Sequence, residues 1–456
     1  MSAHSPLTRK AVLSQAWPIL LSQATIPLVG LVDTAIIGKT GNAIELAGVA
    51  LGASIMGFIF WSFGFLRMGV TGLTAQADGS NNQHEVQALL IRSLLIAIAI
   101  GAVLTSLQLI AIKGAFLILQ ASAETEQAAS GYASARFWGA PAALAGYAIN
   151  GWLLGLGKSG WALALQIIAN TANIIFDLYF VLGLNMGAEG VGWGTAAAEW
   201  TAFLVGISLC AALILKNGGF FKGVFAASSI FNAQRLTHMF NVNIDIMVRT
   251  MALLGLMTWF ANSGAKQGDV QLAANHVLMQ MLTISAFVLD AFAVTAEARI
   301  GAAIGANSKP RFWRAIRLTT EFAFAGALLA SLLIYFGGSA FIHLIMENPD
   351  VRAAAITFLP MAALAPILGV SSWQLDGIFI GSTQTSAMRT STLITLCIYI
   401  GLDLMLQPYG NWGVWIAFIS SYILRGVTLG AFLPRLIQHI DAKAHEHSKD
   451  THVSNA

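Results

Sequence analysis

The chain has 456 residues, of which 57% are hydrophobic and only 10% are charged, and its mean hydropathy is +0.72. Soluble domains carry about 25% charged residues, so this composition excludes a water-soluble globular protein of the same length. The net charge of +3 is too small and too scattered to indicate nucleic-acid binding. The composition therefore predicts an all-α integral membrane protein whose surface is mostly covered by lipid.

Twelve or so segments of the sequence are long and apolar enough to cross a membrane, since a spanning helix needs about 20 mostly apolar residues. They lie near residues 11–38, 45–77, 86–112, 130–156, 159–184, 189–216, 236–262, 270–303, 313–337, 352–381, 385–408 and 411–438. A polar segment divides them near the middle of the chain. We expect an N-lobe (1–215, helices 1–6), a cytoplasmic linker (216–235), a C-lobe (236–441, helices 7–12) and a polar cytoplasmic tail (442–456), whose histidines are expected to be solvated rather than to bind metal.

The lysines and arginines predict how the chain is oriented in the membrane. With the N-terminus in the cytoplasm, most of them fall in inward loops or at inward helix ends, and Arg67, Arg249 and Arg299 fall within spans. The outward loops contain only Lys39, Lys113, Arg136, Lys266 and Arg352. We therefore expect a multi-pass protein of the cell (inner) membrane with both termini in the cytoplasm.

An internal repeat relates the two halves of the chain. A shift of 226 residues aligns Gly79 with Gly305, Asn81 with Asn307, Gly151 with Gly377, and Asp177 with Asp403. Because each half contains an even number of helices, the halves should insert with the same orientation and be related by an axis along the membrane normal. Two pseudo-symmetric six-helix bundles facing a cleft form the architecture of an alternating-access carrier.

Polar residues of the first half gather on one predicted helix face. The fifth span carries Gln166, Asn170, Asn173 and Asp177 at i, i+4, i+7 and i+11. The sixth span adds Thr195 and Glu199, and the first span adds Asp33. An aspartate at the bilayer centre costs on the order of 2.5–3.5 kcal/mol, so these side chains should face the protein interior or a wet cavity.

Three roles are open for this polar face. Burial disfavours the charged form of a carboxylate, so a buried aspartate can take up and release a proton near neutral pH. Oxygens of aspartate, asparagine and threonine can also bind a sodium ion. The third interpretation, which applies above all to Glu199, is a hydrogen-bond network that only holds the helices together.

The second half also carries polar residues within its spans. Asp245 and Arg249 stand four residues apart and are predicted to form a structural ion pair. The candidates for further polar residues that support the site are Asp290, Glu297, Asp376 and Asp403. In the first span, Pro18 and Pro27 should bend the helix, either as a gate that responds to Asp33 or as a static kink.

No sequence motif indicates an enzyme, a metal centre or a cofactor. The chain lacks a phosphate-binding glycine loop and an HExxH motif, and its two cysteines, Cys210 and Cys397, lie in apolar segments. We predict no cofactor and no metal site, and a coupling ion that is a proton, with sodium as the alternative.

Several segments, taken in order, resemble the multidrug and toxic compound extrusion (MATE) family and its DinF-like branch. They are "VDTAIIGKTGNAIELAGVALG" (32–52), "NGWLLGLGKSGWALALQIIANTANIIFDLYFVLGLNMGAEGVGWGTAAAEW" (150–200), "NVNIDIMVRT" (241–250), "LDAFAVTAEARIGAAIGA" (289–306) and "DGIFIGSTQTSAMR" (376–389). The resemblance implies two lobes of six helices and export of amphipathic, often cationic, small molecules in exchange for protons or sodium.

The resemblance also implies which residues couple the ion. In DinF-like members the N-lobe cation site corresponds to Asp33, Asn173, Asp177 and Thr195, and a first-helix proline corresponding to Pro18 is associated with bending. Other branches place a coupling carboxylate on the seventh helix, to which Asp245 corresponds only loosely. The tenth-helix aspartate that sodium-coupled relatives use does not align with Asp376. The alternatives are a flippase for lipid-linked precursors and, more remotely, a membrane-embedded lipid-modifying enzyme. The expected partners are amphipathic drugs and the bilayer, and a monomer is compatible with this architecture.

Overall fold

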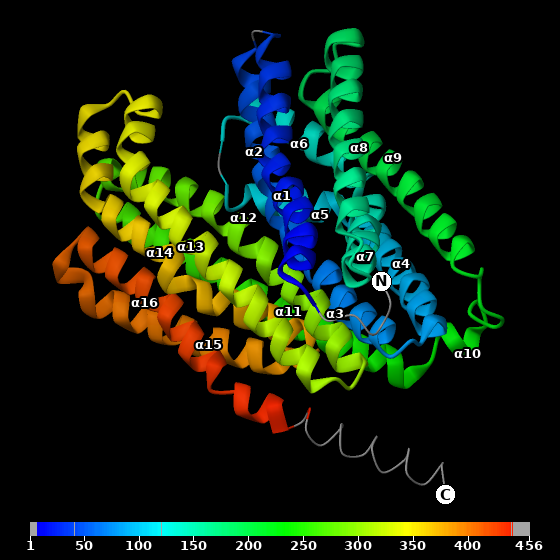
Figure 1. The fold of residues 1–456 in the computed structure, drawn as a ribbon. Helices are drawn as coiled ribbons and strands as arrows, with labels where there is room; N and C mark the ends of the chain where they lie inside the picture. Colours follow the sequence, from blue (N-terminus) through cyan, green and yellow to red (C-terminus); the bar gives the residue numbers. More distant parts are fainter. Residues whose placement is uncertain (1–6, 41, 120, 439, 441–456) are drawn as a thin grey trace, which may run out of the picture. The chain divides into compact units, whose positions relative to one another are not determined.

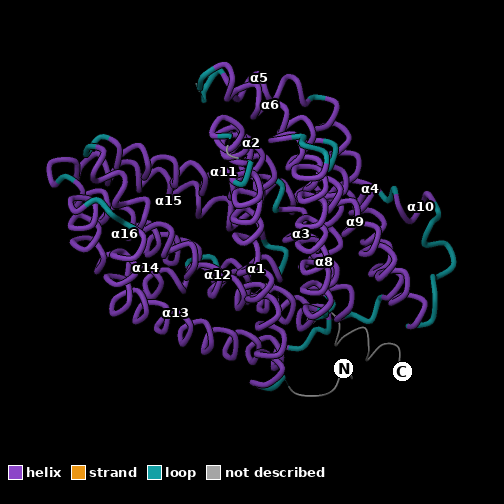
Figure 2. Tube along the Cα trace, turned by 90° about the horizontal axis from the view of Figure 1, so that it is seen from above, coloured by secondary structure: helices purple, strands orange, loops and turns teal. Residues whose placement is uncertain are grey.

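The computed structural model describes residues 7–40, 42–119, 121–438 and 440, and over these residues the chain forms helices and loops without a strand (Figure 2). Within the described residues, eleven helices are long and apolar enough to cross a membrane. The prediction of an all-α, multi-span membrane protein is therefore confirmed. The expected tail, 442–456, lies outside the described residues.

The first half of the chain runs through ten α-helices and one π-helical segment (Figure 1). They are α1 (Arg9–Gly38), α2 (Ala43–Ser62), α3 (Phe65–Gly79), α4 (Gln83–Ser106), α5 (Gln108–Phe116), α6 (Ala123–Phe137), α7 (Ala140–Gly155), α8 (Ser159–Asp177), η1 (Leu178–Gly183), α9 (Gly187–Lys216) and α10 (Ala227–Ile230).

The second half is built from longer helices, coloured green to red in Figure 1. They are α11 (Ala233–Ala265), α12 (Asp269–Gly305), α13 (Lys309–Ile345), α14 (Pro349–Gly381), α15 (Thr385–Leu406), the 3-10 turn η2 (Gln407–Tyr409) and α16 (Asn411–Gly430).

One expected span, 130–156, is divided into α6 and α7 at Trp138 and Gly139. Pro141 accounts for the break, because it stands in the first turn of α7. Proline is tolerated there, whereas in a helix interior it removes a hydrogen bond and clashes with the preceding turn. The approximate count of twelve spans differs from eleven for this reason.

Contacts divide the chain into two compact units, which are described separately. The N-terminal unit comprises Leu21–Thr74 and Asn82–Thr237, and the C-terminal unit comprises the described parts of Met1–Leu20, Ala75–Asn81 and His238–Ala456. The sequence-based boundaries placed residues 1–20 and 75–81 in the N-lobe, but in the structure the described residues 7–20 and residues 75–81 pack with the C-terminal unit. A hydrogen bond from Gln76 Nε2 to the Gly381 carbonyl (2.9 Å) is one of the contacts that hold residues 75–81 there.

Small residues allow the helices of the N-terminal unit to approach closely, as is usual in membranes. A β-carbon on Gly48 would overlap Ala128, and one on Gly101 would overlap Pro141. These two glycines set the contacts of α2 with α6 and of α4 with α7.

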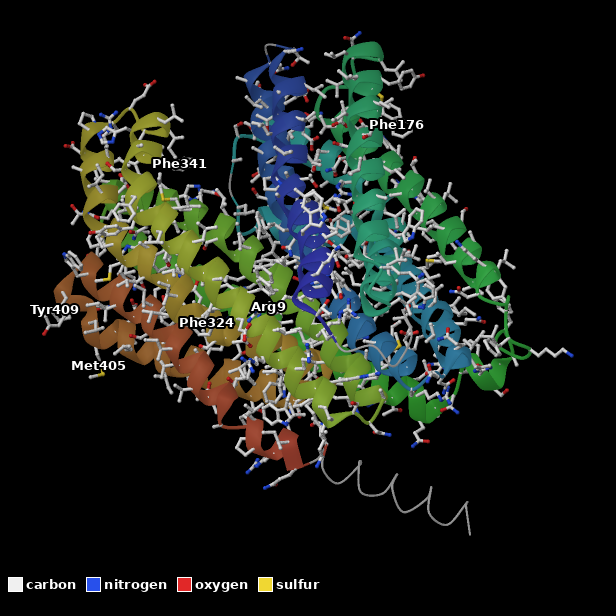
Figure 3. All side chains as sticks on the ribbon, viewed as in Figure 1. Arg9, Phe176, Phe324, Phe341, Met405 and Tyr409 are labelled. Atoms are coloured by element: carbon white, nitrogen blue, oxygen red, sulfur yellow. The ribbon has the colours of Figure 1, made fainter. Side chains whose placement is uncertain are left out.

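Aromatic side chains form the core of the C-terminal unit. Phe260 of α11 lies 4.4 Å from Phe418 and 5.3 Å from Trp415, ring centre to ring centre, and both partners belong to α16. The outer surface of the same unit is also apolar, since Met405 and Tyr409 are exposed and point away from the helices in Figure 3. An exposed apolar surface of this kind is expected where lipid contacts the protein.

The structure carries traces of the internal repeat. Asn81 and Asn307, which are 226 residues apart, both have positive φ angles, of 56° and 50°. Within the C-terminal unit, α3 and α12 meet in a reciprocal contact, because Gly79 faces the backbone of Ala302 while Gly305 faces that of Gln76. The shift of 226 residues relates Gly79 to Gly305 and Gln76 to Ala302. The two contacts are therefore equivalent, as in an isologous contact across a two-fold axis.

Candidate functional site

Two buried aspartates from helices far apart in the sequence meet inside the N-terminal unit. Asp33 of α1 is 7% exposed, and Asp177, the last residue of α8, is fully buried. Their carboxyl groups lie close enough to share a side-chain hydrogen bond, and Asn173, one turn before Asp177, lies beside both. The polar face predicted for the fifth span therefore points toward the first-helix aspartate.

The fourth predicted coupling residue joins this group through Asn173. The Asn173 amide nitrogen donates to the Thr195 hydroxyl (3.2 Å), which in turn donates to the Val191 carbonyl (3.0 Å). We use the name aspartate pair for Asp33 and Asp177, and Asn173 and Thr195 link the pair to α9.

The oxygens of the aspartate pair are short of hydrogen-bond donors. Among the described residues, Asp33 Oδ1, both Asp177 carboxyl oxygens and Asn173 Oδ1 have no donor with hydrogen-bond geometry. Two ionised carboxylates only accept hydrogen bonds and repel each other at this distance. The arrangement is favourable when one carboxyl carries a proton or when a cation lies between the two.

The backbone around Asp177 is adapted to this position. The α-helical hydrogen-bond pattern ends at Asp177 and is followed by the π-helical segment η1; π-helical turns occur frequently at functional sites. On α9, a β-carbon at Gly194 would overlap Asp177 Oδ1 and would lie 3.0 Å from Asp177 Cγ. The absence of a side chain at Gly194 is what allows α9 to pack against the carboxyl group.

Glu199 belongs to a different interaction. Its carboxylate accepts a hydrogen bond from Arg136 of α6 at 2.5 Å, and this guanidinium lies 4.7 Å above the Phe60 ring. Arg136 is also close enough to attract Asp33 electrostatically. Glu199 is thus paired with Arg136, which the sequence placed in an outward loop and which stands in the last turn of α6.

Gln166 and Asn170 lie on the predicted face of α8 but bind each other. The Gln166 amide nitrogen donates to Asn170 Oδ1 at 2.8 Å. This is an i, i+4 hydrogen bond along one helix, so the structure does not bring these two residues into the aspartate pair.

The predicted ion pair between Asp245 and Arg249 is wrong. Asp245 accepts hydrogen bonds from Arg389 (2.5 Å) and Thr385 (3.1 Å), both on α15, whereas Arg249 pairs with Asp376 on α14. The spacing of four residues permits a pair along α11. Neighbouring helices, however, present opposite charges directly to each side chain, and these interhelical partners prevail.

Asp376 is the centre of a buried charge cluster. It pairs with Arg249 and also with Arg425 of α16 at 3.1 Å, and Arg425 lies 5.4 Å above the Trp373 ring. Asp290 of α12 interacts electrostatically with Arg425. One carboxylate held between two guanidiniums ties α11, α14 and α16 together.

Asp403 and Glu297 are the other two acidic residues of the second half that were predicted to support the site. Asp403 accepts hydrogen bonds from Trp259 Nε1 (2.9 Å) and Ser263 Oγ (2.6 Å), so it connects α15 to α11. Glu297 is buried in α12, where its backbone faces Gly381. In the first helix, α1 continues through Pro18 and Pro27 without a break in its helical assignment.

Removing the charge of Asp376 should destabilise the protein. In Asp376→Asn, the guanidiniums of Arg249 and Arg425 stay buried without their shared counter-charge, and breaking a buried pair costs about 3–5 kcal/mol. We expect a clear fall in the melting temperature in detergent. Asp350→Asn, which changes an exposed carboxylate in the first turn of the same helix, is the control and should change stability by less than about 1 kcal/mol. Equal melting temperatures of the two variants would contradict a stabilising role for the cluster.

Sequence reasoning did not identify Gly194 or Arg136 as part of the N-terminal site. The signal for Gly194 is the run of glycines at alternate positions in "GVGWG" (190–194), which indicates close helix contact on both sides. For Arg136 the sequence offers no signal, because its partner Glu199 is distant along the chain.

Comparisons with known proteins agree with this architecture. The model of the MatE family matches residues 18–179 and 250–406. DNA damage-inducible protein F of Escherichia coli (strain K12) is 34% identical over 427 residues, covering 93% of this chain and 92% of the relative. A probable multidrug resistance protein NorM of Acinetobacter baylyi is 22% identical, covering 92% of this chain and 94% of the relative.

Solved structures resemble the fold over nearly its whole length. A crystal structure of MATE in the bent conformation has a TM-score of 0.85 at 18% identity, covering 96% of this chain and 97% of the other. A crystal structure of MATE in the straight conformation has a TM-score of 0.82 at 18% identity, covering 95% and 96%.

Proposed function

Because the chain belongs to the MATE family of membrane transporters, we propose that it is a secondary-active multidrug efflux antiporter. It is a multi-pass membrane transporter and not an enzyme. In the proposal it lies in the inner membrane with both termini in the cytoplasm. It exports amphipathic, often cationic, compounds while a cation moves inward.

The observation that carries the proposal is the aspartate pair. Asp33 and Asp177 are buried together with carboxyl oxygens that lack donors among the described residues. Such a site gains most from binding a single small cation, and a proton satisfies it by converting one carboxylate into a hydrogen-bond donor to the other. We therefore favour a proton as the coupling ion, with sodium as the alternative.

Coupling requires that ion and substrate bind with different affinity to the inward-open and outward-open states. Loading the pair removes the repulsion between α1 and α8, and unloading restores it. The electrical term cancels when one monovalent cationic substrate leaves for each proton that enters, so the pH gradient drives this exchange. Each pH unit supplies about 1.4 kcal/mol per proton, which is enough for roughly a tenfold concentration of substrate. In the proposal, the loaded pair favours the state that releases substrate outward.

The chemistry of the proposed substrates follows from the class of transporter. The relatives named NorM are described as multidrug resistance proteins, so we propose lipophilic cationic drugs and dyes as substrates. A lipid-pyrophosphate flippase is disfavoured, because Arg249, Arg389 and Arg425 within the C-terminal unit are held by aspartates.

Transport in proteoliposomes tests the proposal. The purified protein is reconstituted, and uptake of a fluorescent lipophilic cation is followed under a pH gradient alone, a sodium gradient alone, and no gradient. We expect accumulation under the pH gradient only. Accumulation under sodium alone would assign sodium as the coupling ion, and equal transport in all three conditions would overturn antiport.

A further inference from the structure

A basic cavity lies at the start of α13, within the C-terminal unit. Its volume is about 780 Å³, and it is lined by the first turns of α13, the residues just before it and the start of α1. Four arginines and one glutamate provide its charged lining: Arg9, Arg311, Arg314, Arg317 and Glu321. We call it the arginine cavity, and Figure 3 labels Arg9 at the beginning of α1.

The charges of the arginine cavity do not balance. Glu321 accepts hydrogen bonds from both Arg9 (2.9 Å) and Arg317 (2.9 Å), so a single carboxylate serves two guanidiniums. The Nε of Arg314 donates to the Leu7 carbonyl (2.6 Å), which anchors that side chain by one nitrogen and leaves its terminal nitrogens for another acceptor. The lining keeps an excess of positive charge that calls for an anion.

The same cavity has an apolar side. Exposed Trp313, half-buried Leu7 and buried Leu318 also line it, and α13 continues from this end as a candidate membrane span to Ile345. Tryptophan is enriched where a helix enters the headgroup layer. A ligand that fits both sides has an anionic head and an apolar body.

We propose that the arginine cavity binds the headgroup of an anionic phospholipid. Arg311 and Arg314 meet the phosphodiester, since the planar guanidinium pairs with phosphate oxygens through two parallel hydrogen bonds. Arg9 and Arg317 are held in place by Glu321 and add to the positive field. Trp313, Leu7 and Leu318 contact the glycerol and the upper acyl chains. In other membrane proteins, basic pockets between membrane helices bind anionic headgroups.

Lipid titration of the full-length protein in detergent tests the proposal. Binding of phosphatidylglycerol and of phosphatidylcholine with the same acyl chains is measured by native mass spectrometry. We expect the wild type to prefer phosphatidylglycerol. In Arg311→Gln/Arg314→Gln its affinity should fall by about fivefold per arginine, because each basic side chain near an anionic surface contributes about 1 kcal/mol.

A matched control and a variant that should bind the lipid more tightly distinguish a loss of lipid binding from damage to the fold. Arg435→Gln removes an exposed arginine of the same unit that does not line this cavity, and it should leave lipid binding unchanged. Glu321→Gln removes the carboxylate that competes for Arg9 and Arg317, so it should increase phosphatidylglycerol affinity several-fold. Damage to the fold does not produce such an increase.

Three results would overturn the proposal. The first is equal affinity of the wild type for the two lipids, and the second is an equal loss of binding in Arg435→Gln. The third is displacement of the lipid by inorganic phosphate at matched concentration, which would assign the cavity to a free anion instead of a lipid.

Discussion

Asp177→Asn should abolish most of the gradient-driven transport while leaving the protein folded. Asparagine keeps the size of the side chain and cannot take up a proton, so the aspartate pair loses its ability to load and unload a cation. Coupling free energies of 1–3 kcal/mol correspond to effects of about 5- to 150-fold. We therefore expect accumulation of a lipophilic cation in proteoliposomes to fall by about tenfold or more under a pH gradient.

Asp33→Asn should have the same effect, and the double variant should be no worse than either single one. Residues that act as one unit are not additive, and the two carboxyls share one site. Glu189→Gln is the control, because Glu189 is an exposed carboxylate of the same unit that bonds only to Trp193 among the interactions described for it. Retained accumulation in Asp177→Asn would defeat the assigned role, as would additive losses in the double variant.

The sequence predicted the helices and the polar face of α8 because both depend on local spacing. A run of about 20 apolar residues identifies a span wherever its neighbours lie, and a period of 3.6 residues places Asn173 and Asp177 on one face. The meeting of this face with Asp33 is not contained in either pattern. It came from the family resemblance, and the structure places the three side chains together.

The sequence was least informative about which helices meet. Asp245 and Arg249 are correctly positioned for a pair along α11, yet their partners come from α14 and α15. The packing of residues 75–81 with the C-terminal unit depends in the same way on a contact with distant Gly381. Local spacing determines which side chains share a face, whereas the neighbour of that face is determined by long-range packing.

Gly194→Ala should impair coupling although it replaces no carboxyl group. The added β-carbon would overlap Asp177 Oδ1 and lie 3.0 Å from both the Cγ and the backbone nitrogen of Asp177. The carboxyl must therefore turn away from α9 and from its place beside Asp33. We expect gradient-driven accumulation to fall nearly as far as in Asp177→Asn, by about tenfold. Combining the two substitutions should lower the accumulation little further.

Gly190→Ala is the matched control, one helical turn earlier on α9. Its β-carbon would lie 3.0 Å from Met186 Cβ and 3.2 Å from the Phe180 backbone, so it crowds the segment η1 and not the carboxyl. Both substitutions overpack a helix contact, at a typical cost of 1–3 kcal/mol, and both gain about 1 kcal/mol of helix propensity. Similar melting temperatures with a selective loss of coupling in Gly194→Ala would therefore isolate the position of Asp177. Equal losses of transport in the two variants would instead mean that crowding of α9, and not displacement of the carboxyl, limits the carrier.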